Sequence, residues 1–186
     1  MAYFKHNGAK LYYEIQGTGK PLLLLAGLAS DSQSWLSVVP ELSRHFMLIM
    51  PDNRGCGRTE CSPSSITIEN MATDALALLN ELQTGETLLL GHSMGGMIAM
   101  RLAALGPFRF KRLVLAATAA ALPERTKSLL LDWVHYREAD LPMELWFRNL
   151  FYWIFSPEFF ESPDLVMENI RFAIDYPYPQ HLTQFR

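Results

Sequence analysis

The sequence has 186 residues, enough for one domain with a well-packed core or for one domain with an inserted subdomain. Hydrophobic residues make up 49% of the chain and charged residues 19%, which excludes disordered and fibrous proteins. The net charge of -3 provides no basic surface, so we expect no nucleic-acid partner.

No segment predicts a membrane span, an export signal or a metal site. The apolar run 21–28 is too short to cross a bilayer, and it lies too far from the N-terminus for a signal peptide. Cys56 and Cys61 lie close together in one predicted surface loop, where reduced thiols are the simpler interpretation. These features favour a cytoplasmic protein. No Cys/His cluster has metal-ligand spacing, and we predict no cofactor.

Predicted strands and helices alternate along the first 120 residues. An Asn-Gly turn joins two short strands at 3–5 and 11–15. Continuous apolar runs typical of buried strands follow at 22–26, 46–50, 87–90 and 112–117. Helical spacing predicts helices at 34–44, after the N-cap Thr67, and at 94–105 before Gly106 and Pro107. This alternation predicts an α/β protein with a mostly parallel sheet covered on both faces.

The stretch around Ser93 carries the predicted chemistry. A buried strand ends in Gly-x-Ser-x-Gly, and an apolar helix begins directly afterwards, which is the sequence context of a nucleophile elbow. Gly91 and Gly95 let the strand and helix approach closely. The Ser93 hydroxyl should project from the sheet edge, and the Met94 N–H, at the helix N-terminus, can stabilise an oxyanion. A glycine-rich turn with a capping serine is the alternative.

The pattern changes from Ala121 onward. Helical stretches separated by prolines replace the strands, and most of the aromatic residues lie here. We expect a helical lid subdomain at 121–186, over a core formed by 1–120, with an apolar underside that binds substrate. The alternative is that these aromatics form only the core of the lid. The candidate pocket residues are Gly27, His92, Trp133, Trp146 and Trp153.

Three motifs resemble those of the α/β-hydrolase superfamily, in particular its small bacterial esterases, 3-oxoadipate enol-lactonases and cofactor-free haloperoxidases. They are the elbow at 91–96, the Asp-Asn-Arg-Gly-Cys-Gly run at 52–57, and the segment 26–28 with Trp35 after it. The resemblance implies that Ser93 is the nucleophile and that the backbone N–H groups of Leu28 and Met94 form the oxyanion hole. It implies that Asp52, Arg54, Gly55 and Gly57 shape the loop next to the site and have structural roles.

Two features depart from the family pattern. Ala26 stands where the family most often has a histidine that supports the oxyanion loop. More seriously, the strands that carry the acid and the histidine of the family are not visible, so the sheet is expected to stop after the strand that follows the nucleophile strand. We expect His92 to point into the structure, and His6 and His45 lie in turns. His135 and His181 could substitute as the base.

The sequence therefore leaves two functions open. The first is a serine hydrolase that acts on a small apolar ester or lactone through an acyl-Ser93 intermediate, with an acid and a histidine from outside this chain. The second is a catalytically incomplete fragment that binds an apolar ligand or a partner without turnover. In either case the apolar edge of strand 112–117 predicts association with a complementing C-terminal segment or self-association.

Overall fold

The computed structural model describes residues 2–178 and 182–185. These residues form two compact units, each with its own internal contacts. The first unit contains residues 2–122 together with 182–184, and the second contains 123–178 together with 185. Each unit is described by itself.

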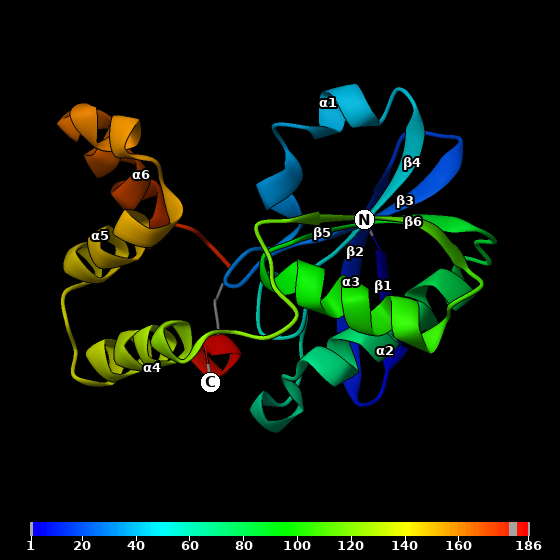
Figure 1. The fold of residues 1–186 in the computed structure, drawn as a ribbon, viewed down its shortest axis with the longest axis horizontal. Helices are drawn as coiled ribbons and strands as arrows, with labels where there is room; N and C mark the ends of the chain where they lie inside the picture. Colours follow the sequence, from blue (N-terminus) through cyan, green and yellow to red (C-terminus); the bar gives the residue numbers. More distant parts are fainter. Residues whose placement is uncertain (1, 179–181, 186) are drawn as a thin grey trace. The chain divides into compact units, whose positions relative to one another are not determined.

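A mixed β-sheet forms the centre of the first unit (Figure 1). The strand order is β1-β2-β4-β3-β5-β6, in which β1 and β2 are antiparallel and the four strands from β4 to β6 run parallel. This arrangement confirms the predicted α/β class. The strand bounds are β1 Ala2–His6, β2 Ala9–Gln16, β3 Lys20–Leu25, β4 Phe46–Pro51, β5 Thr87–His92 and β6 Phe110–Ala116.

Helices pack on the two faces of the parallel strands because alternate apolar side chains point to opposite faces. Leu23 and Leu25 of β3 pack in a core with α2 (Ile68–Glu81) and α3 (Met94–Leu105), which lie side by side in Figure 1. Leu22 and Leu24 pack on the opposite face with the short helix α1 (Val39–Leu42). The buried β3 strand is thus fixed on both sides.

Local signals define the helices that flank the site. The Thr67 hydroxyl accepts the Asn70 N–H at 3.1 Å, which caps α2 as predicted. Helix α3 has the predicted bounds and ends at Gly106.

The helix predicted at 34–44 is wrong. The chain instead forms the 3₁₀ turn η1 (Ser32–Trp35) and then α1. Pro40 lacks an N–H and restricts the residue before it, so a helix can begin at this position but cannot run through it. A further 3₁₀ turn, η2 (Pro63–Ser65), precedes α2.

The last strand of the sheet, β6, is exposed. Within the described residues it pairs only with β5. The Leu113, Val114 and Leu115 side chains are 37%, 53% and 43% exposed, although three consecutive apolar residues on a parallel strand are normally buried. This edge presents both unpaired backbone groups and apolar side chains.

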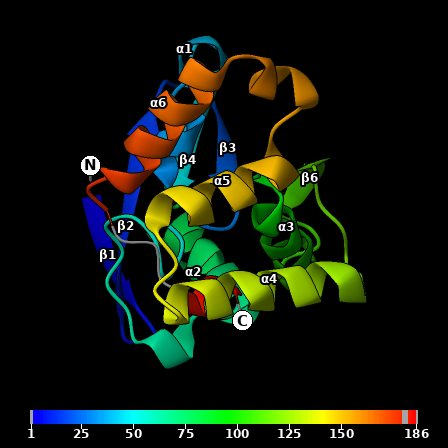
Figure 2. The ribbon, with the colours of Figure 1, turned by 90° about the vertical axis from the view of Figure 1, so that its left-hand side faces the viewer.

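The second unit is helical (Figure 2). Phe151, Val166 and Ile170 are buried at its centre. Prolines precede or begin each helix, where the missing N–H costs no intrahelical bond. No described helix has the length and hydropathy that a bilayer crossing requires. The bounds are α4 Glu124–Glu138, α5 Met143–Ile154, η3 Pro157–Glu161 and α6 Pro163–Ile174. A last turn, η4, spans Leu182–Phe185, and its residues 182–184 group with the first unit.

Candidate active site

Ser93 lies on a strained turn between β5 and α3. Its φ of 52° and ψ of -121° are unfavourable for a residue with a side chain, and they leave Ser93 outside the geometry of both elements. The surrounding backbone holds the turn: the Ser93 N–H donates to the Ala116 carbonyl at 2.9 Å, and the Ser93 carbonyl accepts the Gly96 N–H at 2.9 Å. The strain is therefore maintained by β6 on one side and by α3 on the other.

Glycines make this turn possible because the backbone approaches too closely for a side chain. A Cβ on Gly95 would lie 1.9 Å from the Leu25 carbonyl oxygen, and a Cβ on Gly91 would lie 2.4 Å from the Gly95 carbonyl oxygen. Both distances are far below van der Waals contact. The first turn of α3 is thereby packed directly against the end of β3, which leads into the predicted oxyanion loop.

The predicted oxyanion loop begins beside Ser93. A Cβ on Gly27 would lie 3.2 Å from the Ser93 Cβ, so the two backbones are close. The Gly27 carbonyl accepts the Ser30 N–H at 3.3 Å. In a trans peptide the N–H points opposite to the carbonyl, so the Leu28 N–H is directed away from Ser30. No hydrogen bond within residues 2–178 and 182–185 uses it.

Met94 is the second predicted oxyanion donor. It is the first residue of α3, where an N–H has no intrahelical acceptor and the helix dipole favours negative charge. Its side chain is buried in the core.

The loop after β4 supports the oxyanion loop from the other side of β3. The Asp52 carboxylate accepts the Ser32 N–H at 2.9 Å and the Arg58 N–H at 2.8 Å, and the Asn53 amide donates to the Ala26 carbonyl at 3.1 Å. Ala26 itself is buried. These bonds fasten the oxyanion loop although Ala26 cannot do so through a side chain, and they engage both oxygens of Asp52 structurally.

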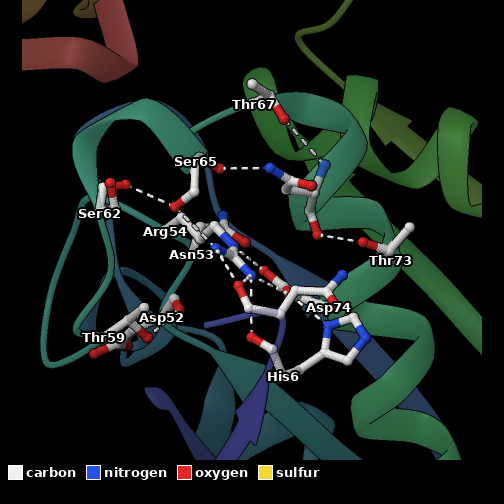
Figure 3. A network of polar contacts seen from close by, with 12 residues as sticks. His6, Asp52, Asn53, Arg54, Thr59, Ser62, Ser65, Thr67, Thr73 and Asp74 are labelled. Carbon is white, nitrogen blue, oxygen red and sulfur yellow. Dashed lines mark hydrogen bonds and ion pairs between the residues drawn. The ribbon is translucent and has the colours of Figure 1, made fainter. Parts of the chain in front are cut away.

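A buried ion pair anchors the same loop to α2 (Figure 3). The Arg54 guanidinium donates to both Asp74 oxygens, at 2.6 and 2.8 Å, and to the Ser65 hydroxyl at 2.8 Å. His6 Nδ1 lies 2.8 Å from the same carboxylate. The pKa of Arg54 is raised, first because it donates to Asp74. Figure 3 shows these groups turned toward one another.

The prediction of one surface loop for both cysteines is wrong for Cys56. Its side chain is 1% exposed, and its thiol donates to the Ser30 carbonyl at 3.1 Å, so it ties the two loops together. Burial raises the pKa of the Cys56 thiol. Cys61 is half-buried, and both cysteines are free thiols.

The histidines do not supply a base in this part of the molecule. His92, the last residue of β5, is exposed, whereas the sequence predicts that it points into the structure. His45 lies 3.8 Å from Glu41 on the surface, and His135 is exposed on α4. Among the described residues of the first unit no histidine is hydrogen-bonded to the Ser93 hydroxyl, and His181 lies outside the described residues.

The three candidate pocket tryptophans all belong to the second unit. Trp133 and Trp146 are each 4% exposed; the Trp133 indole N–H donates to Asn149 at 2.7 Å, and that of Trp146 to the Trp133 carbonyl at 2.8 Å. Trp153 is 48% exposed and lies under Arg125. Two of the three thus belong to the interior of the unit, and their role in a pocket stays a prediction.

Two side chains near the elbow had no predicted role. One is Asn53, described above. The other is Thr118, because a Cβ placed on Gly96 would lie 2.5 Å from the Thr118 Cγ2. No local pattern identifies either contact, because each joins segments distant in sequence. Within the described residues no group of three or more His, Cys, Asp or Glu side chains could hold a metal ion.

A strained serine at the end of a parallel strand, with an apolar helix directly behind it, can be compared with known proteins. The sequence model of the alpha/beta hydrolase fold family matches residues 20–163. The chain belongs to this family.

Its relatives carry out several reactions. The chain is 35% identical over 117 residues to a putative carbamate hydrolase, RutD, of Azorhizobium caulinodans, covering 62% of this chain and 43% of that protein. It is 36% identical over 137 residues to a cis-3-alkyl-4-alkyloxetan-2-one decarboxylase of Shewanella oneidensis, covering 71% and 43%. A thermophilic esterase from Thermogutta terrifontis superposes with a TM-score of 0.79 at 30% identity, covering 95% of this chain and 65% of that one.

The chain therefore spans less than half the length of these two curated relatives. The residues that match the family model, 20–163, include the elbow, the segment 26–28 and the loop 52–57.

Proposed function

We propose that the protein is a serine hydrolase that cleaves a small apolar carboxylic ester or lactone through an acyl-Ser93 intermediate. The observation that carries this proposal is the strained conformation of Ser93 at the start of α3, held by crowded glycine backbone. Strain of this kind persists only where the surrounding structure enforces it, and it is characteristic of functional sites.

In the proposed reaction the Ser93 hydroxyl oxygen attacks the substrate carbonyl carbon and loses its proton to a histidine. The carbonyl oxygen becomes an oxyanion that accepts the Leu28 and Met94 N–H groups. The leaving alcohol takes the proton from the histidine, and water then hydrolyses the acyl-serine by the same steps in reverse order. The support for this oxyanion hole is that neither the Leu28 N–H nor the Met94 N–H donates a hydrogen bond within the described residues.

We propose that the histidine and its acidic partner come from outside these 186 residues. The support is that the Ser93 hydroxyl forms no hydrogen bond with a base among the described residues. The proposed substrate pocket includes Gly27 and His92 of the first unit, and a contribution from Trp133, Trp146 and Trp153 of the second unit stays a prediction. A cytoplasmic location is part of the proposal, and the two free thiols agree with it.

The same missing base favours a second candidate function, a hydrolase fragment that binds an apolar ligand or partner without turnover. Under this alternative the elbow is present, but the serine is not activated.

Covalent labelling distinguishes the two candidates. The protein, together with the segment that supplies the histidine, is treated with a fluorophosphonate probe. The modified residue is located by mass spectrometry in the wild type, in Ser93→Ala and in the matched control Ser64→Ala, which removes an exposed hydroxyl in η2. Labelling in the wild type and in Ser64→Ala but not in Ser93→Ala supports the hydrolase. Folded wild-type protein that is not labelled contradicts it and favours the fragment.

We also propose that the β6 edge pairs with a strand from a complementing C-terminal segment or from a second copy. The support is the exposure of Leu113, Val114 and Leu115 beside unpaired backbone. A lysine at an edge position discourages such pairing, so Val114→Lys should shift the protein toward the monomer in size-exclusion chromatography with light scattering. Wild-type protein that runs as a monomer and unfolds cooperatively would contradict the proposal.

A further inference from the structure

A glutamine near the end of the chain bridges the two loops beside the elbow. The Gln184 side-chain oxygen accepts the Ala29 N–H at 3.0 Å, and its side-chain nitrogen donates to the Arg54 carbonyl at 2.6 Å. The first contact joins residues 155 positions apart in sequence. Gln184 groups with the first unit, so both bonds lie within one compact body.

The peptide that Gln184 contacts is held at both ends. The Leu28–Ala29 peptide presents the Ala29 N–H to Gln184, and its other end, the Leu28 carbonyl, accepts the Ser30 hydroxyl at 3.3 Å. Ala29 has a φ of 53°, a left-handed conformation that is unfavourable for a residue with a side chain. Without an external partner this peptide would be free to rotate toward a relaxed conformation.

We propose that Gln184 is a positioning residue that fixes the oxyanion loop. The Leu28–Ala29 peptide directly follows the one that carries the Leu28 N–H, and the two peptides share the Leu28 Cα, so a displacement of one also displaces the donor on the other. The inference rests on the proposed function, because it assigns the Leu28 N–H to the oxyanion. It adds a residue that no motif of the sequence marks.

Only an amide side chain of this length meets both contacts. Ala29 requires an acceptor and Arg54 requires a donor, and a primary amide has one on each side of the same plane. Methionine has a similar length but offers neither. We therefore use Gln184→Met to remove the bridge while keeping most of the packing.

The matched control is Gln33→Met. Gln33 lies in η1, close in sequence to the same loop, and its amide donates to Glu14 at 3.0 Å without touching the Leu28–Ala29 peptide. Gln33→Met therefore removes a side-chain amide hydrogen bond close to the loop without removing a contact to this peptide.

Two measurements are made on the wild type and on both variants. The first is hydrogen–deuterium exchange of the Ala29 amide, with core amides of α3 confirming that the fold is intact. The second is the kinetics of Ser93 labelling by the fluorophosphonate, separated into a maximal rate and a half-saturating concentration. Loss of one oxyanion donor costs about 10²–10³ in rate, so a misdirected donor should cost about tenfold.

We expect Gln184→Met to speed Ala29 exchange and to lower the maximal labelling rate about tenfold, with the half-saturating concentration little changed. Gln33→Met should change neither. A labelling rate in Gln184→Met equal to that of Gln33→Met would overturn the inference and leave the proposed function standing. If Ser93 is not labelled in the wild type, so that the wild type and Ser93→Ala give the same signal, both the inference and the proposed function are overturned.

Discussion

Two loops flank the end of β3, and they are held in different ways. The elbow after β5 is fixed by backbone crowding, since a single Cβ on Gly95 would overlap the Leu25 carbonyl. The loop after β4 is fixed by buried polar side chains, chiefly the Arg54–Asp74 pair and the Asp52 carboxylate. One loop presents the serine, and the other supports the backbone that faces it.

The difference shows how each loop responds to change. Crowded backbone tolerates no added atom, because the Leu25 carbonyl lies against the first turn of α3. A buried charge pair tolerates changes in nearby packing, but it fails when either partner is lost, because the remaining charge has no water to stabilise it. Substitutions that act on one mechanism and not on the other can test this contrast.

The largest effect is expected from Arg54→Met. It leaves the Asp74 carboxylate buried opposite His6 without its bidentate partner, and breaking a buried pair typically costs about 3–5 kcal/mol. We expect that loss in the free energy of unfolding, measured by urea titration. The double variant Arg54→Met with Asp74→Leu should recover part of it, because no unpaired charge then remains.

The control for this prediction is Arg101→Met. Arg101 also makes a two-bond contact with a carboxylate, that of Glu69, but both side chains are about half exposed. Water can replace the lost partner there, so we expect the urea midpoint to stay nearly unchanged. Equal losses in the Arg54 and Arg101 variants would show that burial is not what makes the first pair important.

A smaller effect on stability, but a direct one on the site, is expected from Gly95→Ala. Its Cβ would lie 1.9 Å from the Leu25 carbonyl oxygen, so α3 and β3 must separate. Overpacking of this kind costs about 1–3 kcal/mol. The matched control is Gly85→Ala, where no atom lies within 4 Å of the new Cβ. We expect Ser93 labelling to fall strongly in Gly95→Ala only; equal labelling in the two variants would contradict the crowded-backbone account.

The same contrast explains which features the sequence predicts. The elbow, α3 and the Thr67 cap follow from residues within a few positions of one another, and the structure confirms those elements. Strand positions also follow from apolar runs, although β6 begins at Phe110, two residues before the predicted start. These features can be predicted because they depend on residues that are close together in the sequence.

Contacts between distant residues could not be predicted. Arg54 and Asp74 are 20 positions apart, and Gln184 lies 155 positions from Ala29, so no spacing rule connects them. The burial of Cys56 has the same origin, because the Ser30 carbonyl that accepts its thiol comes from another loop.

The smallest expected effect is on the solvent accessibility of the loop after β4. Cys56 is buried and its pKa is raised by that burial, so it forms little thiolate, the reactive species. Cys61, five residues later, is half-buried. Iodoacetamide should therefore modify Cys61 at least about tenfold faster than Cys56, and Cys56 should stay protected as the pH rises from about 7 to about 9.

In Arg54→Met the ratio of the Cys61 rate to the Cys56 rate should fall, because the loop opens when its anchor to α2 is lost. Peptide mass mapping gives both rates in one sample, and a ratio unchanged in that variant would mean that the ion pair does not hold the loop closed.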